Sequence, residues 1–225
     1  MPREGKYRGS WPPLPPEEVT KTMQESLDAL LCARYPAIFS ADSSAGQRLF
    51  GFECGDGWFT LIDAMCELIQ HDIETNGTQQ FVAVQVKEKF GGLRFYYRKG
   101  SDYAAAVIEL AEFLSPSICE ICGALGKTVS LFGWMQTRCP VHEHTTVYEG
   151  PLLTLEDNLP LVPPMGELLG AALAFFALDG QAAARWLTQP APALAHTVPL
   201  ALAGSADGQR QILTLIGQLE HGITP

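Results

Sequence analysis

The chain has 225 residues, of which 47% are hydrophobic and 18% are charged, and its formal net charge is −10. This composition is typical of a folded protein with a sizeable core and excludes a fully disordered chain. The negative charge argues against generic coating of DNA or RNA, because polyanions repel an acidic protein. Residues 1–16 hold prolines and basic residues but no apolar run, so we predict a loose arm and not a signal peptide. We therefore expect a cytoplasmic protein.

Residues 17–148 have the mixed periodicity of an α+β domain. Apolar residues spaced three and four apart predict a helix that begins at Glu17 and ends at Pro36. The same spacing predicts two further helices, over residues 55–74 and 102–114. We therefore expect a first domain that is partly helical.

A β-hairpin is predicted between the second and third of these helices. The segment "FVAVQVKEKFGGLRFYYRKG" alternates apolar and polar residues on both sides of Gly91 and Gly92. Strict alternation would place Val82, Val84 and Val86 on one face of the first strand.

The predicted hairpin also carries a concentration of positive charge, interleaved with aromatic residues. Its basic residues are Lys87, Lys89, Arg94, Arg98 and Lys99. Cations and aromatic rings on a ribbon can follow a phosphate backbone and stack on bases, which makes the hairpin a candidate surface for nucleic acid or another ligand. The alternative is a half-exposed hairpin whose aromatic rings face the core and whose cations pair with a neighbouring acidic surface.

Four of the metal-binding residue types fall into two closely spaced pairs. Cys119, Cys122, Cys139 and His142 form the pattern C-x2-C-x16-C-x2-H. Zinc favours four such ligands in a tetrahedron, and a two-residue spacer lets both members of a pair reach one ion. His144 is a second option for the fourth ligand. Because four protein ligands leave no open position for water, we predict a structural Zn²⁺ and not a catalytic one.

The chain shows no convincing catalytic constellation. A phosphate-binding loop, a nucleophile elbow and a paired-carboxylate motif are all missing from the sequence. We therefore do not expect an enzyme. The segment "VKEKFGGLRFYY" followed by "CEICG" resembles uncharacterised zinc-ribbon-like proteins of phages and bacteria over residues 50–145, and this resemblance implies no function.

The remainder of the chain predicts a second, helical domain. Residues 149–165 carry four prolines without clear periodicity and are interpreted as a linker. Residues 166–225 are rich in alanine and leucine and predict a small all-α domain. Its last helix is expected to begin after Ser205 and to stop at Gly222. The apolar run over residues 168–178 is too short to cross a bilayer, so we expect no membrane partner.

This second domain contains an ordered series of short motifs. They are Arg185-Trp186-Leu187, Pro192-Ala193-Leu194, Pro199-Leu200, Gly208 and Glu220-His221-Gly222. In this order and approximate spacing they resemble the C-terminal toxin-binding domain shared by Xre, MbcA and ParS antitoxins. Two positions depart from the family pattern: Ala191 stands where Asn is usual, and Ala195-His196 stands where Gly-Gly is usual. Both departures stiffen a turn.

The resemblance implies a protein that binds another protein. Members of the family neutralise RES-fold toxins, which consume NAD or transfer ADP-ribose from it, and their C-terminal region lies at the mouth of the NAD pocket. Carried over, the residues that would occlude this pocket are Glu220, His221, Gly222, Ile223, Thr224 and Pro225. Arg185 and Trp186 would be interface anchors, since both residue types are common in binding hot spots.

The sequence therefore predicts an α+β domain with a hairpin and a zinc knuckle, followed by a small all-α domain. The favoured function is an antitoxin or immunity protein that neutralises a RES-type toxin. The alternative is a zinc-containing regulator that binds nucleic acid through residues 87–99. A second copy of the chain is a further candidate partner. Relatives usually carry a helix-turn-helix domain before the toxin-binding module, and residues 1–150 show no such pattern.

Overall fold

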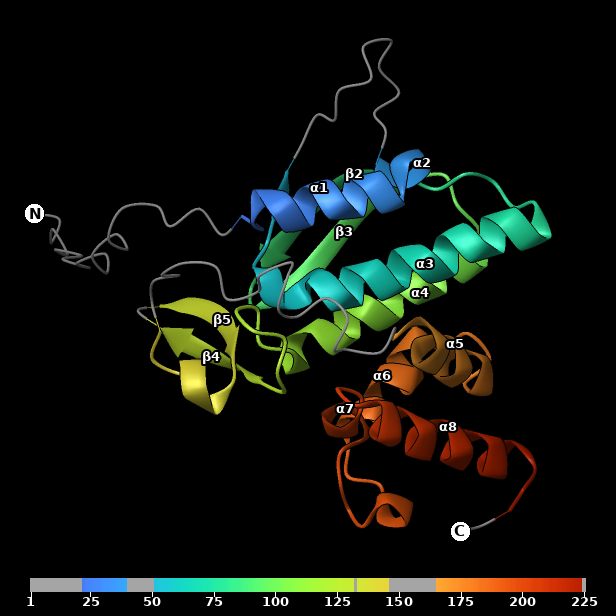
Figure 1. The fold of residues 1–225 in the computed structure, drawn as a ribbon. Helices are drawn as coiled ribbons and strands as arrows, with labels where there is room; N and C mark the ends of the chain where they lie inside the picture. The colour runs from blue at the N-terminus through green and yellow to red at the C-terminus, as the bar shows by residue number, and fades with distance from the viewer. Residues whose placement is uncertain (1–21, 40–50, 132, 146–164, 224–225) are drawn as a thin grey trace, which may run out of the picture.

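The computed structural model describes residues 22–39, 51–131, 133–145 and 165–223. The N-terminal part combines helices with a small sheet, as predicted (Figure 1). Its elements are α1 (Glu25–Arg34), α2 (Pro36–Phe39), β1 (Phe52–Glu53), the 3-10 turn η1 (Asp56–Trp58), α3 (Phe59–Asn76), β2 (Val82–Lys89), β3 (Gly92–Arg98) and α4 (Asp102–Leu114). The predicted bounds of α4 are confirmed, and Ser101 caps the helix by accepting a hydrogen bond from the Ala104 backbone N–H.

The first helix differs from its prediction. It begins at Glu25 and ends at Arg34, just before Pro36, so the predicted end is confirmed. Pro36 then opens a further short helix, α2, which was not predicted. Proline fits the first position of a helix, where its missing N–H has no partner to lose. The predicted start at Glu17 lies outside the described residues.

The three strands form one sheet in the order β1-β2-β3, with β1 parallel and β3 antiparallel to β2. The open edge of β3 is covered by the end of α4. There the backbone N–H of Phe95 donates to Glu112 and the N–H of Leu93 donates to Ser115 Oγ. These two bonds satisfy donors that would otherwise offer a template for another strand.

The hairpin prediction is confirmed, but its expected alternation is wrong in the first strand. The register shifts between Ala83 and Gln85. These two residues pair with the consecutive residues Tyr97 and Tyr96 of β3, so β2 has one extra residue at this point. A bulge of this kind adds one residue to a strand. As a result Ala83 and Val86 are buried, whereas Val84 is 43% exposed. The two-residue turn is Phe90-Gly91, both at positive φ, instead of Gly91-Gly92.

A second hairpin lies between the two pairs of metal-binding residues and was not predicted. Its strands are β4 (Lys127–Leu131) and β5 (Trp134–Arg138), flanked by the 3-10 turns η2 (Ser115–Ser117) and η3 (Pro140–His142). It lies against the tip of the first hairpin, where Thr137 Oγ1 donates a 2.5 Å hydrogen bond to the carbonyl of Gly91.

The C-terminal part is entirely helical among its described residues, as predicted. Its elements are α5 (Gly166–Phe175), α6 (Gly180–Thr188), η4 (Pro192–Leu194), α7 (Pro199–Leu202) and α8 (Ala206–Glu220). Ser205 caps α8 by accepting from the Gly208 N–H at 3.1 Å. Gly222 has a φ of 67° just after the helix, the left-handed conformation that commonly ends helices. Both predicted ends of α8 are confirmed.

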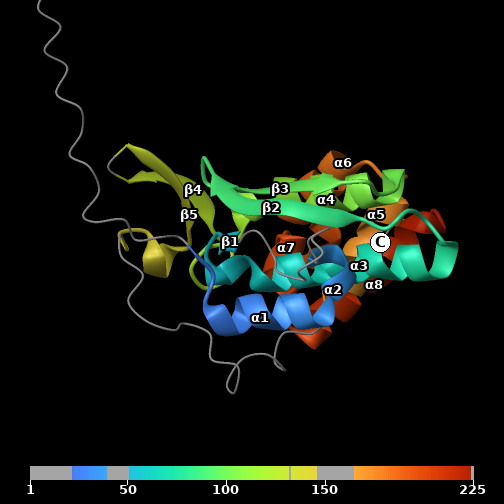
Figure 2. The same ribbon diagram turned by 90° about the horizontal axis from the view of Figure 1, so that it is seen from above.

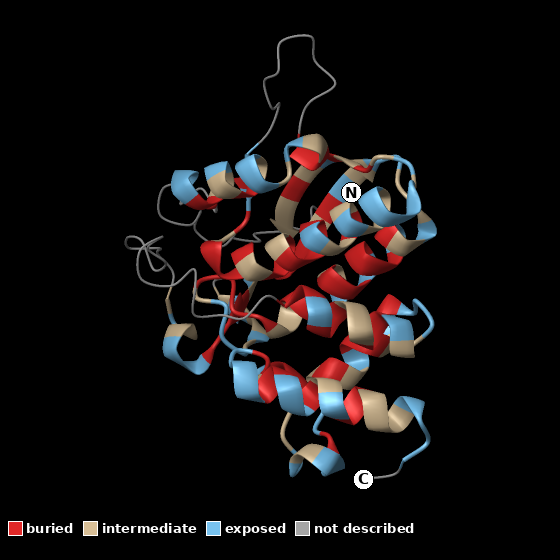
Figure 3. Cartoon of the chain, turned by 45° about the vertical axis from the view of Figure 1, so that its right-hand side comes forward, coloured by how far each residue is buried: buried red, intermediate tan, exposed pale blue. Residues whose placement is uncertain are grey.

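The helical part packs directly on the N-terminal part. Helices α3 and α4 occupy the middle of the molecule, with α1 and the sheet on one side and α5 to α8 on the other (Figures 1 and 3). One cluster of buried apolar residues extends from Met23 to Ile216 through both parts. Helix α6 crosses α4 closely at Gly180, where an added Cβ would lie 2.6 Å from Leu110 N and 2.7 Å from Ala106 O.

No single helix among the described residues is long and apolar enough to cross a membrane. Helices α5 and α6 meet that length and composition only when they are counted together, and they are bent by 115° relative to each other.

Candidate metal centre and toxin-binding surface

The four predicted metal ligands come together in space. Cys119 and Cys122 belong to the loop after η2, whereas Cys139 directly precedes η3 and His142 is its last residue. Their four ligand atoms all lie within 4.8 Å of one another. His144 is exposed and is not part of this group, so the structure favours His142 as the fourth ligand.

The spacing of these atoms fits one tetrahedral ion. Zn–S bonds of about 2.3 Å place two tetrahedral sulfur ligands roughly 3.8 Å apart. In the structure the sulfurs of Cys122 and Cys139 are 3.7 Å apart. The Nδ1 atom of His142 lies 3.6 Å from the sulfur of Cys119 and 3.3 Å from that of Cys139. All six cysteines are free of disulfides, so the three thiols are available to a metal.

The hydrogen bonding of the cluster favours a thiolate at Cys119. A hydrogen bond from the Cys122 thiol lowers the pKa of the Cys119 thiol, and this effect outweighs the opposing effect of burial. The same hydrogen bond, together with burial, raises the pKa of Cys122. Cys119 is therefore favoured as the thiolate, whereas Cys122 keeps its proton. A divalent cation would displace this proton, since zinc binds cysteine as thiolate.

Two glycines at the η1 turn, just before α3, pack against the loop that carries Cys119 and Cys122. The backbone of Gly55 lies against the carbonyl of Glu120, and that of Gly57 lies against the backbone of Cys119 and Cys122, so that a Cβ at either glycine would overlap the loop. The N–H of Gly57 donates to Glu120 O at 3.0 Å. These contacts couple the loop to the main core and were not apparent from the sequence.

Two polar contacts complete this support. The indole of the fully buried Trp58 donates to the carbonyl of Ile118 at 2.9 Å. The buried side chains of Glu120 and Arg138 form an ion pair, which joins the first cysteine pair to β5. Removing one partner of such a pair leaves a buried charge uncompensated. The cluster is therefore tied into the main core, and its four side chains lie where they could hold one metal ion.

The predicted toxin-binding residues lie on two separate elements. Arg185 is exposed near the end of α6, whereas Trp186 is half-buried, with its ring 6.3 Å from that of Phe176. Glu220, His221, Gly222 and Ile223 are exposed at the end of α8, and Ile223 is a large apolar residue with 54% exposure. Thr224 and Pro225 lie outside the described residues. The exposure of Ile223 leaves an apolar side chain available to a partner.

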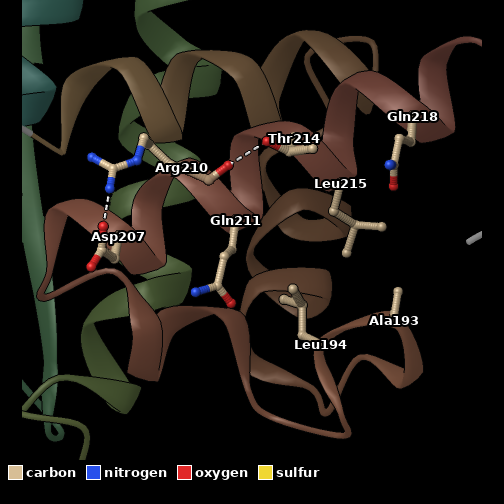
Figure 4. A pocket seen from close by; sticks show the side chains of 8 residues that line it. All are labelled: Ala193, Leu194, Asp207, Arg210, Gln211, Thr214, Leu215 and Gln218. Atoms are coloured by element: carbon tan, nitrogen blue, oxygen red, sulfur yellow. Dashed lines mark hydrogen bonds and ion pairs between the residues drawn. The ribbon is translucent and has the colours of Figure 1, made fainter.

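A groove lies beside these residues, between η4 and α8 (Figure 4). It has an open volume of about 540 Å³. Leu194 and Leu215 face each other across its floor, while Arg210 and Asp207 form an ion pair at one end. The remaining lining residues are Ala193, Gln211, Thr214 and Gln218. Such an apolar floor with a polar rim suits a protein side chain.

The turn between η4 and α7 holds two residues in the left-handed conformation. Ala195 has a φ of 53° and His196 a φ of 59°. These are the two positions where the toxin-binding family usually has glycine. L-residues with a Cβ disfavour this conformation, whereas glycine adopts it freely. The structure thus gives a physical reason for the family's glycines.

Replacing Ala195 by glycine is expected to stabilise the protein by about 0.5–1 kcal/mol, because it removes the Cβ from a left-handed residue. The matched control is Ala174→Gly at an exposed position within α5, which should destabilise the protein by about 1 kcal/mol. Urea unfolding measures both free energies. If Ala195→Gly were as destabilising as the control, the assigned turn conformation would be wrong.

The basic residues of the first hairpin contribute no side chain to the metal-ligand cluster or to the groove. Lys89, Arg98 and Lys99 are exposed, and Lys87 and Arg94 are half-buried. Lys87 and Arg94 are directly opposite each other in the register of β2 and β3. The structure therefore brings the two central cations of the predicted set together on one hairpin.

The geometry defines a protein with a metal-ligand cluster at one end and a small helical module with an open groove at the other. Residues 171–222 match the family model of the antitoxin Xre/MbcA/ParS C-terminal toxin-binding domain. This match confirms the resemblance found in the sequence, and it identifies the C-terminal part of the chain as similar to a toxin-binding domain. No curated protein and no solved structure matches the chain.

Proposed function

We propose that the protein is a stoichiometric inhibitor of a RES-type, NAD-consuming toxin. The observation that carries this proposal is the match of residues 171–222 to a toxin-binding domain. These residues cover the second half of α5 and all of α6, η4, α7 and α8. An inhibitor needs an accessible surface and no catalytic group of its own. The exposed end of α8 and the adjacent groove supply that surface.

In this proposal the tail that follows α8 closes the toxin's NAD pocket. The residues assigned to the plug are Glu220, His221, Gly222, Ile223, Thr224 and Pro225. The exposed Ile223 would enter an apolar part of the pocket, and burial of such a side chain contributes about 1.5–3 kcal/mol. The groove beside Leu194 and Leu215 would receive a side chain of the toxin, and Arg185 and Trp186 would contact it from α6.

The cysteine cluster is proposed to hold one Zn²⁺ with a structural role. Its donor set and spacing fit a tetrahedral ion, and Cys119, Cys122, Cys139 and His142 would hold it. Zinc with four protein ligands supplies cross-linking of the chain and no reactive position. The two ligand pairs would thereby be joined across the β4–β5 hairpin.

Deleting residues 220–225 is expected to abolish rescue of cells that express a cognate RES-domain toxin, because the plug is removed while the module's core is kept. The full chain should restore growth in the same assay. Deletion of residues 2–16 is the control, and it should leave rescue intact, since the toxin-binding segment begins far downstream. Undiminished rescue by the chain that lacks residues 220–225 would exclude the tail as the plug.

A further inference from the structure

The first hairpin concentrates positive charge in a chain that is acidic as a whole. Five of the 15 lysines and arginines fall within residues 87–99, although the net charge of the chain is −10. Residues 82–99 hold five cations and one acidic residue, Glu88, so the hairpin has a formal charge of 5 − 1 = +4. This charge is opposite in sign to that of the whole chain.

These cations lie on the open side of the sheet. Figure 2 shows β2 and β3 running side by side along one side of α1 and α3. Phe95 and Val86, which are paired in the register, are buried, and the next pair along the ladder, Lys87 and Arg94, points to the opposite side. Tyr96, one residue beyond Phe95, is 43% exposed. The side of the sheet away from the core thus combines charge with an aromatic ring.

We define the basic face as Lys87, Lys89, Arg94, Tyr96 and Arg98. None of its four cations forms an ion pair with a carboxylate in the described part of the chain. Two lysines approach aromatic rings instead, with the Nζ of Lys87 lying 5.3 Å from the ring centre of Tyr96 and that of Lys89 5.3 Å from that of Phe90. The alternative expectation, that these cations pair with a neighbouring acidic surface, is not what the described residues show.

We propose that the basic face binds single-stranded nucleic acid. The cations would contact phosphates, and the exposed rings of Tyr96 and Phe90 would stack on unpaired bases, because base–aromatic stacking needs no particular sequence. A purely acidic protein partner would use the cations but would not need flat exposed rings beside them. A duplex keeps its bases stacked inside, so it offers the rings no base to stack on.

This activity belongs to a surface separate from the proposed toxin-binding one. The basic face is formed by β2 and β3, whereas the groove and tail belong to α8 and its surroundings. The inference does not rest on toxin neutralisation, and either can fail without the other.

The test is fluorescence anisotropy of the full-length protein with labelled oligo(dT) and oligo(U) of about 20 nucleotides and a duplex of equal length. We expect saturable binding of the single strands at about 50 mM salt, weakening steeply by about 200 mM. Three to five phosphate contacts predict a slope of about −2 to −3.5 for log K against log salt concentration, since each contact on a single strand contributes about −0.7. The duplex should bind more weakly.

Matched variants separate the basic face from general charge. Lys87→Ala/Arg98→Ala should reduce the magnitude of the salt slope by about 1.4, whereas Lys127→Ala/Arg210→Ala, which removes the same charge from β4 and α8, should leave the slope unchanged. Tyr96→Ala should weaken binding at least about fivefold, while Tyr96→Phe, which keeps the ring, should bind like the parent protein.

Three results of these direct binding measurements would overturn the proposal. They are a lack of binding to any oligonucleotide at low salt, an equal loss of binding in the two charge variants, and a Tyr96→Ala variant that binds like the parent. Polyglutamate that competed as well as oligo(dT) would point to an acidic protein partner and would also overturn it.

Discussion

Gly180→Ala is expected to destabilise the protein by about 2–3 kcal/mol, the usual cost of forcing an extra group into a packed interface. The added Cβ would lie 2.6 Å from Leu110 N and 2.7 Å from Ala106 O. Both are backbone atoms of α4, so the clash cannot be relieved by turning a side chain. Helix α6 would have to move away from α4, and with it the interface that joins the helical module to the rest of the chain.

Gly217→Ala is the matched control for this substitution. Gly217 lies within α8, and nothing would lie within 4 Å of its added Cβ. The same methyl group should therefore stabilise the protein by up to about 1 kcal/mol, because alanine favours helix over glycine. Thermal and urea unfolding measure the difference. Equal effects of the two substitutions would contradict the close α4–α6 crossing.

Replacing Cys119 and Cys122 together by serine is expected to eliminate metal binding. The parent protein should carry about one zinc per chain, and the double variant should carry none, because two of four ligands are lost. Structural zinc sites of this kind contribute about 10–16 kcal/mol of apparent binding free energy in small peptides, so the loop and the β4–β5 hairpin should lose their fixed structure with the metal. Metal analysis and hydrogen exchange of residues 115–145 measure the two effects.

Cys32→Ser provides the control, since Cys32 lies on α1 outside the metal-ligand group. This variant should keep a full equivalent of zinc. Lowering the pH from about 8 to about 5 should release the metal from the parent protein, because protons compete with zinc for the thiolates. A full zinc equivalent in the double variant, or none in the parent protein, would show that the four residues are not the metal site.

Much of this fold follows from local patterns in the sequence. Ser101 and Ser205 stand where the helices α4 and α8 begin, and both act as caps. The spacing of the cysteine pairs predicted a cluster that the folded chain brings together. These features depend on residues close in sequence, where periodicity and capping rules apply.

Other features depend on contacts between distant segments and could not be predicted. The bulge between Ala83 and Gln85 turns the side chain of Val84 to the exposed side of the sheet. The alternating valines of the sequence do not indicate this bulge. The docking of the Gly57 backbone on the metal-binding loop joins residues more than 60 apart in sequence. Gly180 was not singled out in the sequence, and only the structure shows that its backbone packs on α4.

The division into two parts joined by residues 149–165 stays a prediction, since residues 149–164 lie outside the described residues. The structure shows that the helical module buries Leu168, Leu169 and Leu187 in the same apolar cluster as the N-terminal part. Any account of toxin binding must therefore treat the module as attached to α3 and α4.

The central claim is that the C-terminal module blocks a NAD-consuming toxin by binding it. The most direct measurement is a titration of the purified RES-domain toxin with the full-length protein, following NAD consumption. We predict that activity falls linearly to near zero at a fixed stoichiometric ratio, and that the chain lacking residues 220–225 leaves the activity intact. Undiminished NAD consumption in the presence of excess full-length protein would contradict the account.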